Sequence, residues 1–572
     1  MNERGTKARI LVAALALLMA VSGLGARLAY LHIGVDDAVR DRTDATRRIE
    51  RQLLAGRGRI LDRNGSGGIL AINLAVKDVC ADPALLAANP EDLQLTTAAL
   101  ADFFDLPADE LAVRLNRPDR RFAYIARYVH REQADKLAAM DLPGVFFRDT
   151  TVRYYPHGDF MSHILGFVNR EGVGSAGIEQ QFDSFLRGSP GFMEGSVNAF
   201  RQELYTKRGR VVPALDGASI ELTIDQYIQD MVEKALDTVM EEYGAQGAWA
   251  IVQHVASGAV LAMANRPAYD PNVFFRSAED TRLNRAIGYV YEPGSTFKCV
   301  LFAAALNEGI ITPEDVYDCE NGAWSYANRV LRDYSPHGKL TVREGFQKSS
   351  NIMTAKIALQ LGDRRQHDYL TAFGIGRPLG IDLPGEEAGI LHPVNRWSQV
   401  CATRIPIGQG VAVTGLQMIS VVSAIANEGR LMRPFVVRRV TAEDGTLLFE
   451  NSPQELGRPI RPDTAGIMVD LMRAVTAPGG TGTRALVDGY NVAGKTGTAQ
   501  KAVAGGYSAT GYIASFAGFL PAENPQISVI VVVDEPQPVR TGGRVAAPVF
   551  SEIASGAIQY LNIAPLQSVA RW

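Results

Sequence analysis

The sequence has little cysteine and no pair of cysteines at a spacing typical of a site. Its 572 residues include 4 cysteines, which stand far apart at Cys80, Cys299, Cys319 and Cys401. Without a CxxC pair the chain predicts neither a zinc ribbon nor a disulfide framework. The 8 histidines show no HExxH or other paired spacing. We therefore expect no metal site, and nothing else in the sequence predicts a cofactor.

An excess of charge of one sign is also missing. Lysine and arginine number 58 against 62 for aspartate and glutamate, a net charge of −4, and no long basic run occurs. A nucleic-acid partner is therefore not expected. Hydrophobic residues make up 47% of the chain and charged residues 21%. This composition is typical of folded domains, and at roughly 150 residues per domain the length predicts about two to four of them.

Long apolar runs are absent except for one near the N-terminus. Residues 10–26 carry no charge, and the apolar character continues past Arg27. At about 1.5 Å per residue this run covers about 25 Å, the lower end of a bilayer crossing. Basic side chains precede it, so the positive-inside rule predicts a cytoplasmic segment 1–9, a transmembrane anchor 10–33 and the bulk of the chain on the outer (periplasmic) side of the inner membrane. The alternative is a cleaved signal peptide, because small residues at 22–26 suit a cleavage site.

Beyond the anchor the chain divides into two unlike parts. Residues 34–214 mix glycine-rich turns, short alternating runs and helical pieces such as 91–115 without a repeat, which favours an irregular α+β domain. We place a boundary near residue 215. Alternating apolar residues then predict a strand over 218–225, and helical spacing predicts a helix over 226–242.

The C-terminal part, residues 215–565, contains strand-like runs separated by turn residues. These runs are 249–255, 258–264, 490–498, 512–520 and 527–534. The first two are joined by a hairpin signal at Ala256-Ser257-Gly258. We expect a five-stranded antiparallel sheet, with the helices of residues 297–470 inserted between its second and third strands. The predicted fold class is α+β: a transmembrane helix, an irregular α+β domain, and a C-terminal domain whose sheet is flanked by helices.

Residues Gly489 to Thr496 match the phosphate-binding pattern GxxxxGK[ST] letter for letter. That loop binds nucleotide only where a strand precedes it and a helix follows. Here residues 491–493 read as a strand, and the glycine-rich segment 497–506 cannot begin an amphipathic helix. A nucleotide site is therefore not expected.

The lysine of that pattern also belongs to a set of three short elements. They are Ser295-Thr296-Phe297-Lys298, Ser349-Ser350-Asn351 and Lys495-Thr496-Gly497-Thr498. Each alone would arise by chance in a chain of this length, so their order and context carry the information. A turn at 291–294 followed by apolar residues at helical spacing predicts that Ser295 opens a buried helix. Ser295 and Lys298 would then share one face, with the amine within reach of the hydroxyl.

A serine nucleophile needs a base, and no Asp-His pattern near Ser295 supplies one. Lys298 is the remaining choice. It would have to be neutral at pH 7, which burial and a second ammonium at Lys495 would favour. The N-terminus of the helix would stabilise the alkoxide and a nearby oxyanion.

The third element would supply a binding edge. Gly494 and Gly497 lack side chains where a substrate backbone must approach closely, and Thr496 and Thr498 carry hydroxyls along the same edge. Such an edge suits a peptide bound as an added strand.

With these elements the chain resembles the penicillin-binding proteins and serine β-lactamases, whose SxxK, SxN and KTG elements occur in this order. Other segments resemble class B penicillin-binding proteins over essentially the whole chain. They are Arg57–Gly65, Arg153–Pro156, Gly177–Glu179, Leu222–Asp225, Ala262–Ala264, Pro271-Asn272, Leu383–Glu386, Gly408–Gly410 and Ala546–Phe550. The first two belong to the non-catalytic domain of that class, which argues against a free β-lactamase. The resemblance implies a pedestal (dimerisation-like) domain over 34–214 and a transpeptidase domain over 215–565.

The resemblance further implies a peptidoglycan D,D-transpeptidase that is a penicillin target. Ser295 would attack the penultimate D-Ala carbonyl of a stem peptide and form an acyl-enzyme, with Lys298 as base. Ser349 would relay a proton to the leaving amine. Lys495 would be the fourth catalytic residue and would meet the terminal carboxylate. A neighbouring stem peptide's amine would then take the acyl group.

The implied substrate-binding residues are Asn351, Thr496, Gly497 and Thr498. Asn351 would hold the substrate amide, and the two threonines would meet the terminal carboxylate. Backbone N–H groups of Ser295 and Thr498 would form the oxyanion hole.

The modest length, the single anchor and the end at Trp572 without appended repeats most resemble the cell-division (septal) member of the class. An elongation-type transpeptidase is the alternative within the class, and a catalytically silent scaffold of the wall-synthesis complex is the alternative from another class. The implied partners are stem peptides as D-Ala-D-Ala donor and amine acceptor, β-lactams, the inner membrane, a membrane glycosyltransferase and other division proteins.

Two positions depart from the family pattern. Leu379 stands where threonine is usual, and Ser350 stands where β-lactamases carry aspartate, which favours a transpeptidase. In the segment 57–65 we expect the charges of Arg57, Asp62 and Arg63 to form an internal ion-pair network. The alternative is a contact with another protein.

Overall fold

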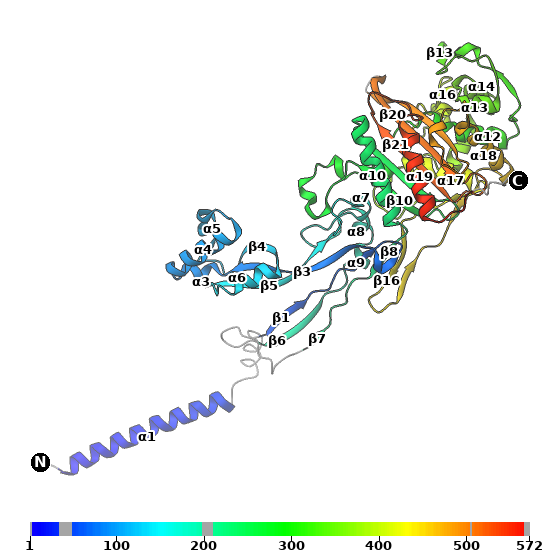
Figure 1. Cartoon of the computed structure of the whole chain (residues 1–572). Helices are drawn as coiled ribbons and strands as arrows, with labels where there is room; N and C mark the ends of the chain where they lie inside the picture. Colours follow the sequence, from blue (N-terminus) through cyan, green and yellow to red (C-terminus); the bar gives the residue numbers. More distant parts are fainter. Residues whose placement is uncertain (1–2, 34–47, 197–209, 504–505, 566–572) are drawn as a thin grey trace. The chain divides into compact units, whose positions relative to one another are not determined.

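The computed structural model describes residues 3–33, 48–196, 210–503 and 506–565 (Figure 1). Residues 34–47 and 197–209 of the predicted domain 34–214, and the terminal Trp572, lie outside these ranges. Contacts divide the chain into two units, residues 1–55 with 189–215, and residues 56–188 with 216–572.

The first unit contains one long helix and a small sheet. Helix α1 (Glu3–Ile33) includes a stretch, Gly5–His32, that is long and apolar enough to cross a membrane. A signal sequence near the N-terminus would meet the same test of length and composition, so both predictions for this segment stand. The sheet is antiparallel in the order β1-β6-β7, with β1 (Arg48–Leu53), β6 (Gly191–Ser196) and β7 (Val211–Val212).

The centre of the second unit is the five-stranded antiparallel sheet that the sequence predicts. Its order is β10-β9-β21-β20-β19. The strands are β9 (Gly247–His254), β10 (Val260–Arg266), β19 (Ala493–Val503), β20 (Gly506–Leu520) and β21 (Ile527–Asp534). The prediction is confirmed, and β19, which carries the KTG element, lies at one edge.

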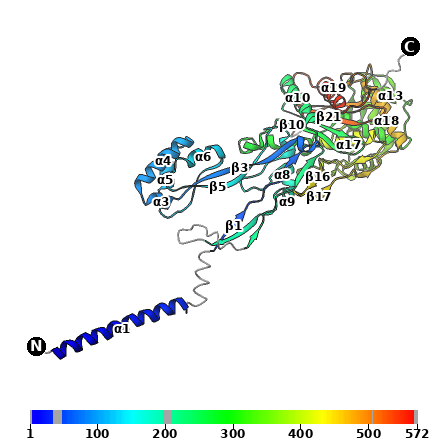
Figure 2. The same cartoon turned by 60° about the horizontal axis from the view of Figure 1, so that its bottom comes forward.

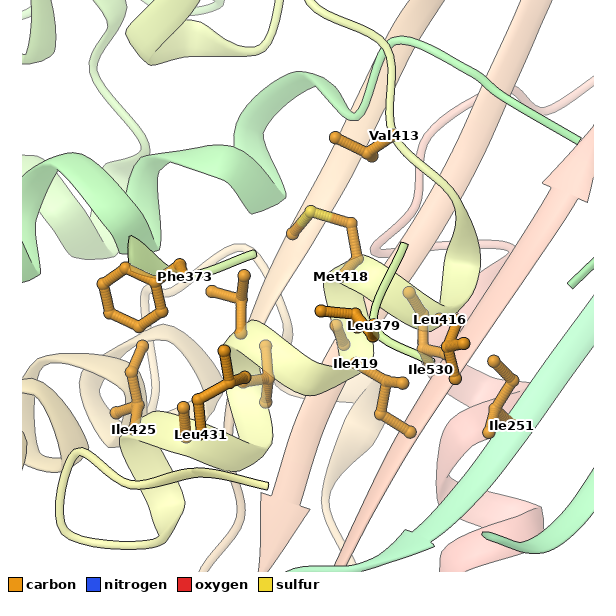
Figure 3. Packing of buried hydrophobic residues seen from close by; sticks show 14 of the residues in the cluster. Ile251, Phe373, Leu379, Val413, Leu416, Met418, Ile419, Ile425, Leu431 and Ile530 are labelled. Atoms are coloured by element: carbon orange, nitrogen blue, oxygen red, sulfur yellow. The ribbon is translucent and has the colours of Figure 1, made fainter. Parts of the chain in front are cut away.

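Helices cover both faces of this sheet, as Figure 2 shows for the region of β10 and β21. Helices α10 (Gln226–Tyr243) and α19 (Ala546–Tyr560) share one core cluster with the sheet, and α17 (Gly415–Ala426) shares the other. Leu416 and Ile419 of α17 lie beside Ile251 and Ile530 of the sheet (Figure 3). Every residue of β21 is buried, which fits a strand covered on both faces.

The segment between β10 and β19 forms the helical part, as predicted. Its helices are α11 (Arg285–Gly288), α12 (Lys298–Asn307), α13 (Val342–Lys348), α14 (Asn351–Leu361), α15 (Asp363–Ala372), α16 (Cys401–Arg404), α17 and α18 (Pro462–Thr476). Short two-stranded sheets join β11 (Val316–Asp318) to β14 (Lys339–Thr341), β12 (Ala323–Tyr326) to β13 (Arg329–Arg332), and β15 (Leu431–Met432) to β18 (Glu455–Gly457). Nearly all of α12 is buried and apolar, which is typical of a core helix.

A second sheet joins strands from both sides of residue 215. Its order is β17-β16-β8-β2-β3-β4, and β5 also pairs with β3. The strands are β2 (Ile60–Leu61), β3 (Ile69–Ala81), β4 (Ala123–His130), β5 (Val145–Tyr154), β8 (Ser219–Leu222), β16 (Val437–Thr441) and β17 (Leu447–Glu450). The division into 34–214 and 215–565 stays a prediction.

One end of this sheet forms a lobe with four helices. These are α3 (Pro83–Ala87), α4 (Pro90–Phe104), α5 (Ala108–Leu115) and α6 (Arg131–Ala138). The helical piece predicted over 91–115 is therefore two helices. Asp105 takes a left-handed conformation with φ 52° and Pro107 follows, so the first helix cannot continue. Short helices α7 (Ser162–Leu165), α8 (Gly177–Gln181) and α9 (Asp183–Leu186) lie further along the chain.

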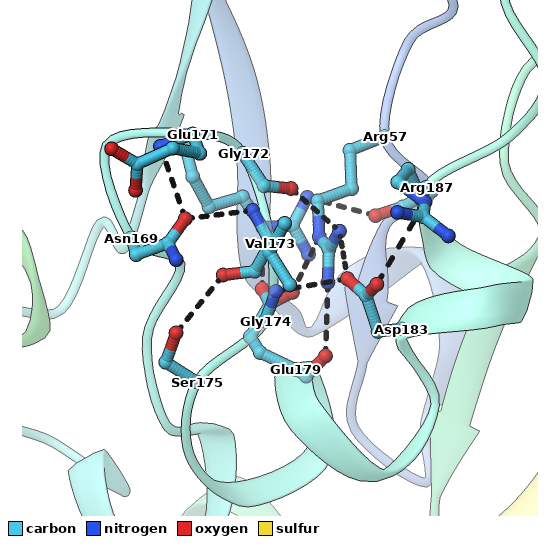
Figure 4. A network of polar contacts seen from close by, with 12 residues as sticks. Arg57, Asn169, Glu171, Gly172, Val173, Gly174, Ser175, Glu179, Asp183 and Arg187 are labelled. Atoms are coloured by element: carbon cyan, nitrogen blue, oxygen red, sulfur yellow. Dashed lines mark hydrogen bonds and ion pairs between the residues drawn. The ribbon is translucent and has the colours of Figure 1, made fainter.

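Arg57 is held in a buried ion-pair network (Figure 4). Its Nε lies 2.6 Å from Glu179 Oε2, and its Nη1 lies 2.7 Å from Asp183 Oδ1. Arg153 Nε contacts the other oxygen of Glu179, also at 2.6 Å. Glu179 is fully buried, so both of its oxygens need such donors. The internal network predicted for Arg57 is confirmed.

Asp62 and Arg63 do not join that network. The Asp62 carboxylate accepts hydrogen bonds from the Asn64 backbone N–H and side chain within its own turn. Arg63 Nε lies 3.8 Å from Asp225 Oδ2. Arg63 thus also pairs within the protein as predicted, whereas among the described residues Asp62 has no ion-pair partner and closes its own turn instead.

Candidate active site

Ser295 lies in a tight turn that runs directly into α12. The turn is a 3-10 helix, η5 (Gly294–Phe297), so the predicted helix start is a 3-10 turn before the α-helix. Gly294 has φ +56°, and a Cβ there would lie 2.9 Å from the carbonyl oxygen of Thr498. Its N–H donates to the Gly408 carbonyl at 3.3 Å. The turn is thus wedged between β19 and the segment at Gly408, with Ser295 half-buried.

The second element connects two helices. Ser349 follows α13 in a left-handed conformation with φ +60°, and Ser350 begins α14 by accepting a hydrogen bond from the Met353 N–H. Asn351 is the first residue of α14. A sharp change of chain direction at Ser349 therefore places the serine and the asparagine side by side.

The third element lies on the edge strand β19. Lys495 is fully buried. Thr496 and Thr498 leave the strand on the face opposite to Lys495, because successive side chains alternate. Thr496 Oγ1 lies 2.8 Å from Thr481 Oγ1, and Thr498 Oγ1 accepts the Gly542 N–H at 3.1 Å. A ligand group could meet all three side chains only at the free edge of the strand.

Hydrogen bonds join residues of all three elements. Lys298 Nζ donates to Ser349 O at 2.6 Å, to Ser349 Oγ at 3.1 Å and to Asn351 Oδ1 at 2.7 Å. Lys495 Nζ donates to the same Ser349 Oγ at 2.9 Å. The Ser349 hydroxyl therefore stands between the two lysines.

Burial changes the acid–base properties of both lysines. The pKa of Lys298 lies well below its usual value of 10.5, first because the side chain is buried and second because of the charge of Lys495. The Asp333 carboxylate opposes this shift. Burial also lowers the pKa of Lys495, to about 8. The two causes expected from the sequence for a neutral Lys298 are therefore both present.

The expected contact between Lys298 and Ser295 is not made. No hydrogen bond joins Lys298 Nζ to Ser295 Oγ, and within the described ranges the Ser295 hydroxyl has no hydrogen-bond partner. The reason is that the amine is turned toward Ser349 and Asn351. Sequence spacing placed both groups on one turn, but the acceptors of Ser349, between α13 and α14, and of Asn351 decide where the amine points.

The two glycines of β19 lie where a side chain would meet neighbouring parts of the protein. A Cβ at Gly497 would lie 2.2 Å from Ser515 Oγ and 3.0 Å from the Pro293 carbonyl oxygen. A Cβ at Gly494 would lie 2.4 Å from the ring of Phe516. The Cβ positions are therefore taken up by the protein itself, and the close approach of a substrate backbone to this strand stays a prediction. The glycines allow η5 and β20 to pack against the strand.

Asp333 is a residue of this cluster that sequence reasoning missed. Its Oδ2 accepts from Ser350 Oγ at 2.7 Å, and its Oδ1 accepts from the N–H groups of Asn351 and Ile352 at 2.6 and 3.0 Å. It thereby caps α14 from the end of the β12–β13 hairpin. The only signal in the sequence was Ser350, a serine where β-lactamases carry aspartate. No pattern in the sequence indicated that a carboxylate 17 positions before Ser350 would contact it.

Two other sequence observations are resolved by the structure. Strand β19 continues through Lys495 and Thr496 to Val503, so no helix follows the GxxxxGK[ST] pattern and it is not a phosphate-binding loop. Leu379, the departure from the family pattern, is buried in the main core cluster. Its backbone N–H donates to Glu386 Oε1 at 2.6 Å, so the core accommodates the leucine.

Taken together, the cluster has the parts needed for acyl transfer. Ser295 is a half-buried hydroxyl at the start of a helical turn, where N–H groups lack partners within the helix. Lys298 is a buried amine whose pKa is lowered, and Lys495 is a second cation beside an open strand edge. A nucleophile, a base and a site for an anion are thus within one small region.

Comparisons with known proteins agree with this geometry. The sequence profile of the penicillin-binding protein transpeptidase domain matches residues 248–555, and that of the penicillin-binding protein dimerisation domain matches residues 52–222. The peptidoglycan D,D-transpeptidase FtsI of Escherichia coli K12 is 32% identical over 559 residues, which cover 96% of this chain and 91% of that protein. The probable peptidoglycan D,D-transpeptidase PenA of Neisseria meningitidis serogroup A is 32% identical over 97% of this chain and 93% of its own length.

A solved structure shows the same fold. Penicillin-binding protein 3 of Mycobacterium tuberculosis, in complex with aztreonam, superimposes with a TM-score of 0.70 at 28% identity. The match covers 90% of this chain and 98% of that structure.

Proposed function

The chain belongs to the class B penicillin-binding proteins, and on that premise we propose that it is a serine peptidoglycan D,D-transpeptidase of septal wall synthesis and a target of penicillin. The observation that carries this proposal is the Ser349 hydroxyl, hydrogen-bonded to both Lys298 and Lys495 beside the half-buried Ser295. Relatives named FtsI and PenA support the D,D-transpeptidase activity, and the FtsI relative supports the septal role.

In the proposed acylation, the Ser295 oxygen attacks the carbonyl carbon of the penultimate D-Ala. Neutral Lys298 takes the hydroxyl proton, for which its lowered pKa prepares it. As the carbon–nitrogen bond breaks, the proton passes through Ser349 to the leaving amine of the terminal D-Ala. Ser349 suits this step because its oxygen already contacts Lys298. The amine of a second stem peptide then attacks the ester and regenerates Ser295.

The remaining residues of the cluster bind the donor peptide in this proposal. Lys495, as an ammonium, meets the terminal carboxylate at the edge of β19, together with Thr496 and Thr498. Asn351 holds the substrate amide. The donor peptide adds to β19 as an extra strand, with the backbone of Gly497 in line.

The membrane arrangement is also part of the proposal. Helix α1 anchors the chain, and the bulk lies on the outer side of the inner membrane, where peptidoglycan is built. A membrane glycosyltransferase and other division proteins are the proposed partners, because cross-linking requires new glycan strands.

The proposal is tested with the purified full chain, a D-Ala-D-Ala donor peptide and an amine acceptor. We expect release of D-Ala and formation of the cross-linked product, with both abolished by prior treatment with penicillin. A folded protein that forms neither product nor a penicillin adduct would favour the silent scaffold.

The pH dependence of the same reaction follows from the two lysines. Lys298 acts when neutral, so activity is lost as the pH falls through its lowered pKa. Lys495 acts when charged, so activity is lost as the pH rises through about 8. We expect a bell-shaped profile of kcat/KM whose upper limb lies near pH 8. A Lys495→Arg variant keeps its charge, and its residual activity should show no fall at that pH. A native profile that is flat to pH 10 would contradict the role of Lys495.

Replacing Asp333 by asparagine should slow penicillin acylation roughly 10-fold, because the amide nitrogen cannot accept the Ser350 hydroxyl as the carboxylate oxygen does, and Ser350 loses its fixed position. The cap itself should persist, because the asparagine oxygen can still accept the N–H groups of Asn351 and Ile352, and asparagine caps helices about as well as aspartate. Since the Asp333 carboxylate raises the pKa of Lys298, the lower limb of the pH profile should move to lower pH in this variant. Asp315→Asn is the control, because Asp315 only closes a surface turn through the Thr312 N–H. If the variant is slower but the acidic limb of its pH profile does not move, Asp333 acts only by holding α14 and does not raise the pKa of Lys298.

A further inference from the structure

The lobe formed by β3, β4, β5 and helices α3 to α6 has one open sheet face. Val79, Ala81 and Ile125 belong to the core cluster that the strands share with the helices. Cys80 pairs with Tyr124 on β4 and with Phe146 on β5. Because neighbouring residues of a strand point to opposite faces, Tyr124 and Phe146 point away from the helices.

Aromatic rings gather on this open face. The ring of Phe122 lies 4.7 Å from that of Tyr124 in an edge-on arrangement, and 6.1 Å from that of Phe146. Phe122 and Phe146 are 38% and 37% exposed. Large apolar side chains exposed together, rather than singly, are typical of a binding surface.

Arginines surround the rings. The guanidinium of Arg127 lies 3.7 Å from the centre of the Tyr124 ring, and that of Arg148 lies 5.7 Å from the centre of the Phe122 ring. Arg148 Nη1 is also 3.5 Å from the Tyr124 hydroxyl. Arg114 of α5, on the helix side, donates a hydrogen bond to the Tyr124 backbone carbonyl oxygen and so is not part of the open face. The contacts of Arg127 and Arg148 hold their guanidinium planes against the rings.

No carboxylate neutralises these arginines. Arg127 and Arg148 form no ion pair with any described residue, and the same is true of the exposed Arg117, Arg120 and Arg121 before β4. Asp78 stands opposite Arg148 in the sheet, but it is buried and accepts the N–H of Tyr128. Arg131 on α6, by contrast, pairs with Asp135. The positive charge of the open face is therefore left for a ligand.

A ligand for this face must offer both flat apolar surfaces and carboxylates. Arginine binds carboxylates with two parallel hydrogen bonds, and aromatic rings pack against the apolar faces of sugar rings. Peptidoglycan strands, the substrate under the proposed function, carry sugar rings and stem-peptide carboxylates in every repeat. An acidic peptide supplies only the second of these chemistries.

We propose that the aromatic–arginine face, made of Phe122, Tyr124, Phe146, Arg127 and Arg148, binds peptidoglycan strands through their sugar rings and stem-peptide carboxylates. This inference rests on the proposed function, but it concerns a site separate from Ser295. Binding at this face would hold a peptidoglycan strand on the protein independently of the acyl-transfer reaction at Ser295.

The test is co-sedimentation of the full-length protein in detergent with purified, insoluble peptidoglycan. The protein is first saturated with penicillin, so that the Ser295 site is closed. We expect the native protein to pellet, and the double variant Arg127→Ala/Arg148→Ala to bind at least 10-fold more weakly. Phe122→Ala should weaken binding to glycan strands freed of stem peptides. The matched control is Arg131→Ala, an exposed arginine on α6, which should bind as the native protein does.

Two results would overturn the proposal. One is equal pelleting of the native protein and the double variant. The other is displacement of the native protein by polyglutamate as effectively as by soluble peptidoglycan fragments, which would identify an acidic protein as the partner. Fluorescent penicillin labels all variants equally if they fold. A chain that pellets but is never acylated would contradict the proposed function and leave this inference standing.

Discussion

Replacing Ser295 by alanine should abolish covalent labelling of the full-length protein by a fluorescent penicillin. The acyl-enzyme bond is made by the Ser295 oxygen in the proposed mechanism, and alanine has no atom to replace it. The measurement is in-gel fluorescence of the membrane fraction, with the band of the native chain as reference. Labelling is expected to fall to background.

The Ser295 site is well suited to a clean test. The side chain is half-buried and its hydroxyl has no hydrogen-bond partner within the described ranges, so the substitution leaves no buried group unpaired. The folded state should therefore persist, which a thermal melt can check. Ser175→Ala is the matched control and should label normally, because Ser175 is an exposed loop serine distant in sequence from Ser295. Labelling that survives in Ser295→Ala would place the nucleophile elsewhere.

Replacing Lys298 by methionine should slow acylation by penicillin about 1,000-fold, within the range of general-base contributions. Methionine fills a similar volume but cannot take the Ser295 proton. The measurement is the acylation rate as a function of penicillin concentration, which separates the first-order step from the initial binding. We expect the first-order step to fall and the initial binding to change little, because Lys495 still meets the carboxylate.

This variant also removes a buried hydrogen-bond donor. Lys298 Nζ donates hydrogen bonds to the Ser349 carbonyl oxygen and to the Asn351 amide oxygen. Without this donor both oxygens lose a partner, so the variant should also be less stable. A thermal melt separates this effect from catalysis. Lys348→Met is the matched control, because Lys348 Nζ donates to the Gly479 carbonyl outside the cluster. An acylation rate within a few fold of native in folded Lys298→Met would show that another group is the base.

Much of the fold was predictable because its signals are local. Short apolar runs bounded by turn residues mark the strands of the five-stranded sheet, and a short turn closes the β9–β10 hairpin, so both were found from neighbouring residues alone. The helix predicted over 91–115 failed for a local reason too. Asp105 takes a left-handed conformation before Pro107, and the apolar spacing on either side hid that break.

The sequence predicted which residues form the candidate site, but it did not predict the hydrogen bonds between them. The three motifs named Lys298, Ser349, Asn351 and Lys495 from their residue types and order. They did not indicate that Lys298 contacts Ser349 rather than Ser295, or that the β19 glycines make room for η5 and β20. Asp333 was missed because a single aspartate in a loop has no pattern around it.

The sequence by itself determined the elements, their order and the chemical groups available, since helix, strand and turn preferences depend on residues a few positions apart. Only the tertiary structure decided which groups meet. Lys495 and Ser349 are 146 positions apart, and Lys298 and Ser349 are 51 apart. Folding alone buries both lysines beside one hydroxyl, and that burial lowers their pKa values, because an ammonium taken out of water loses its hydration.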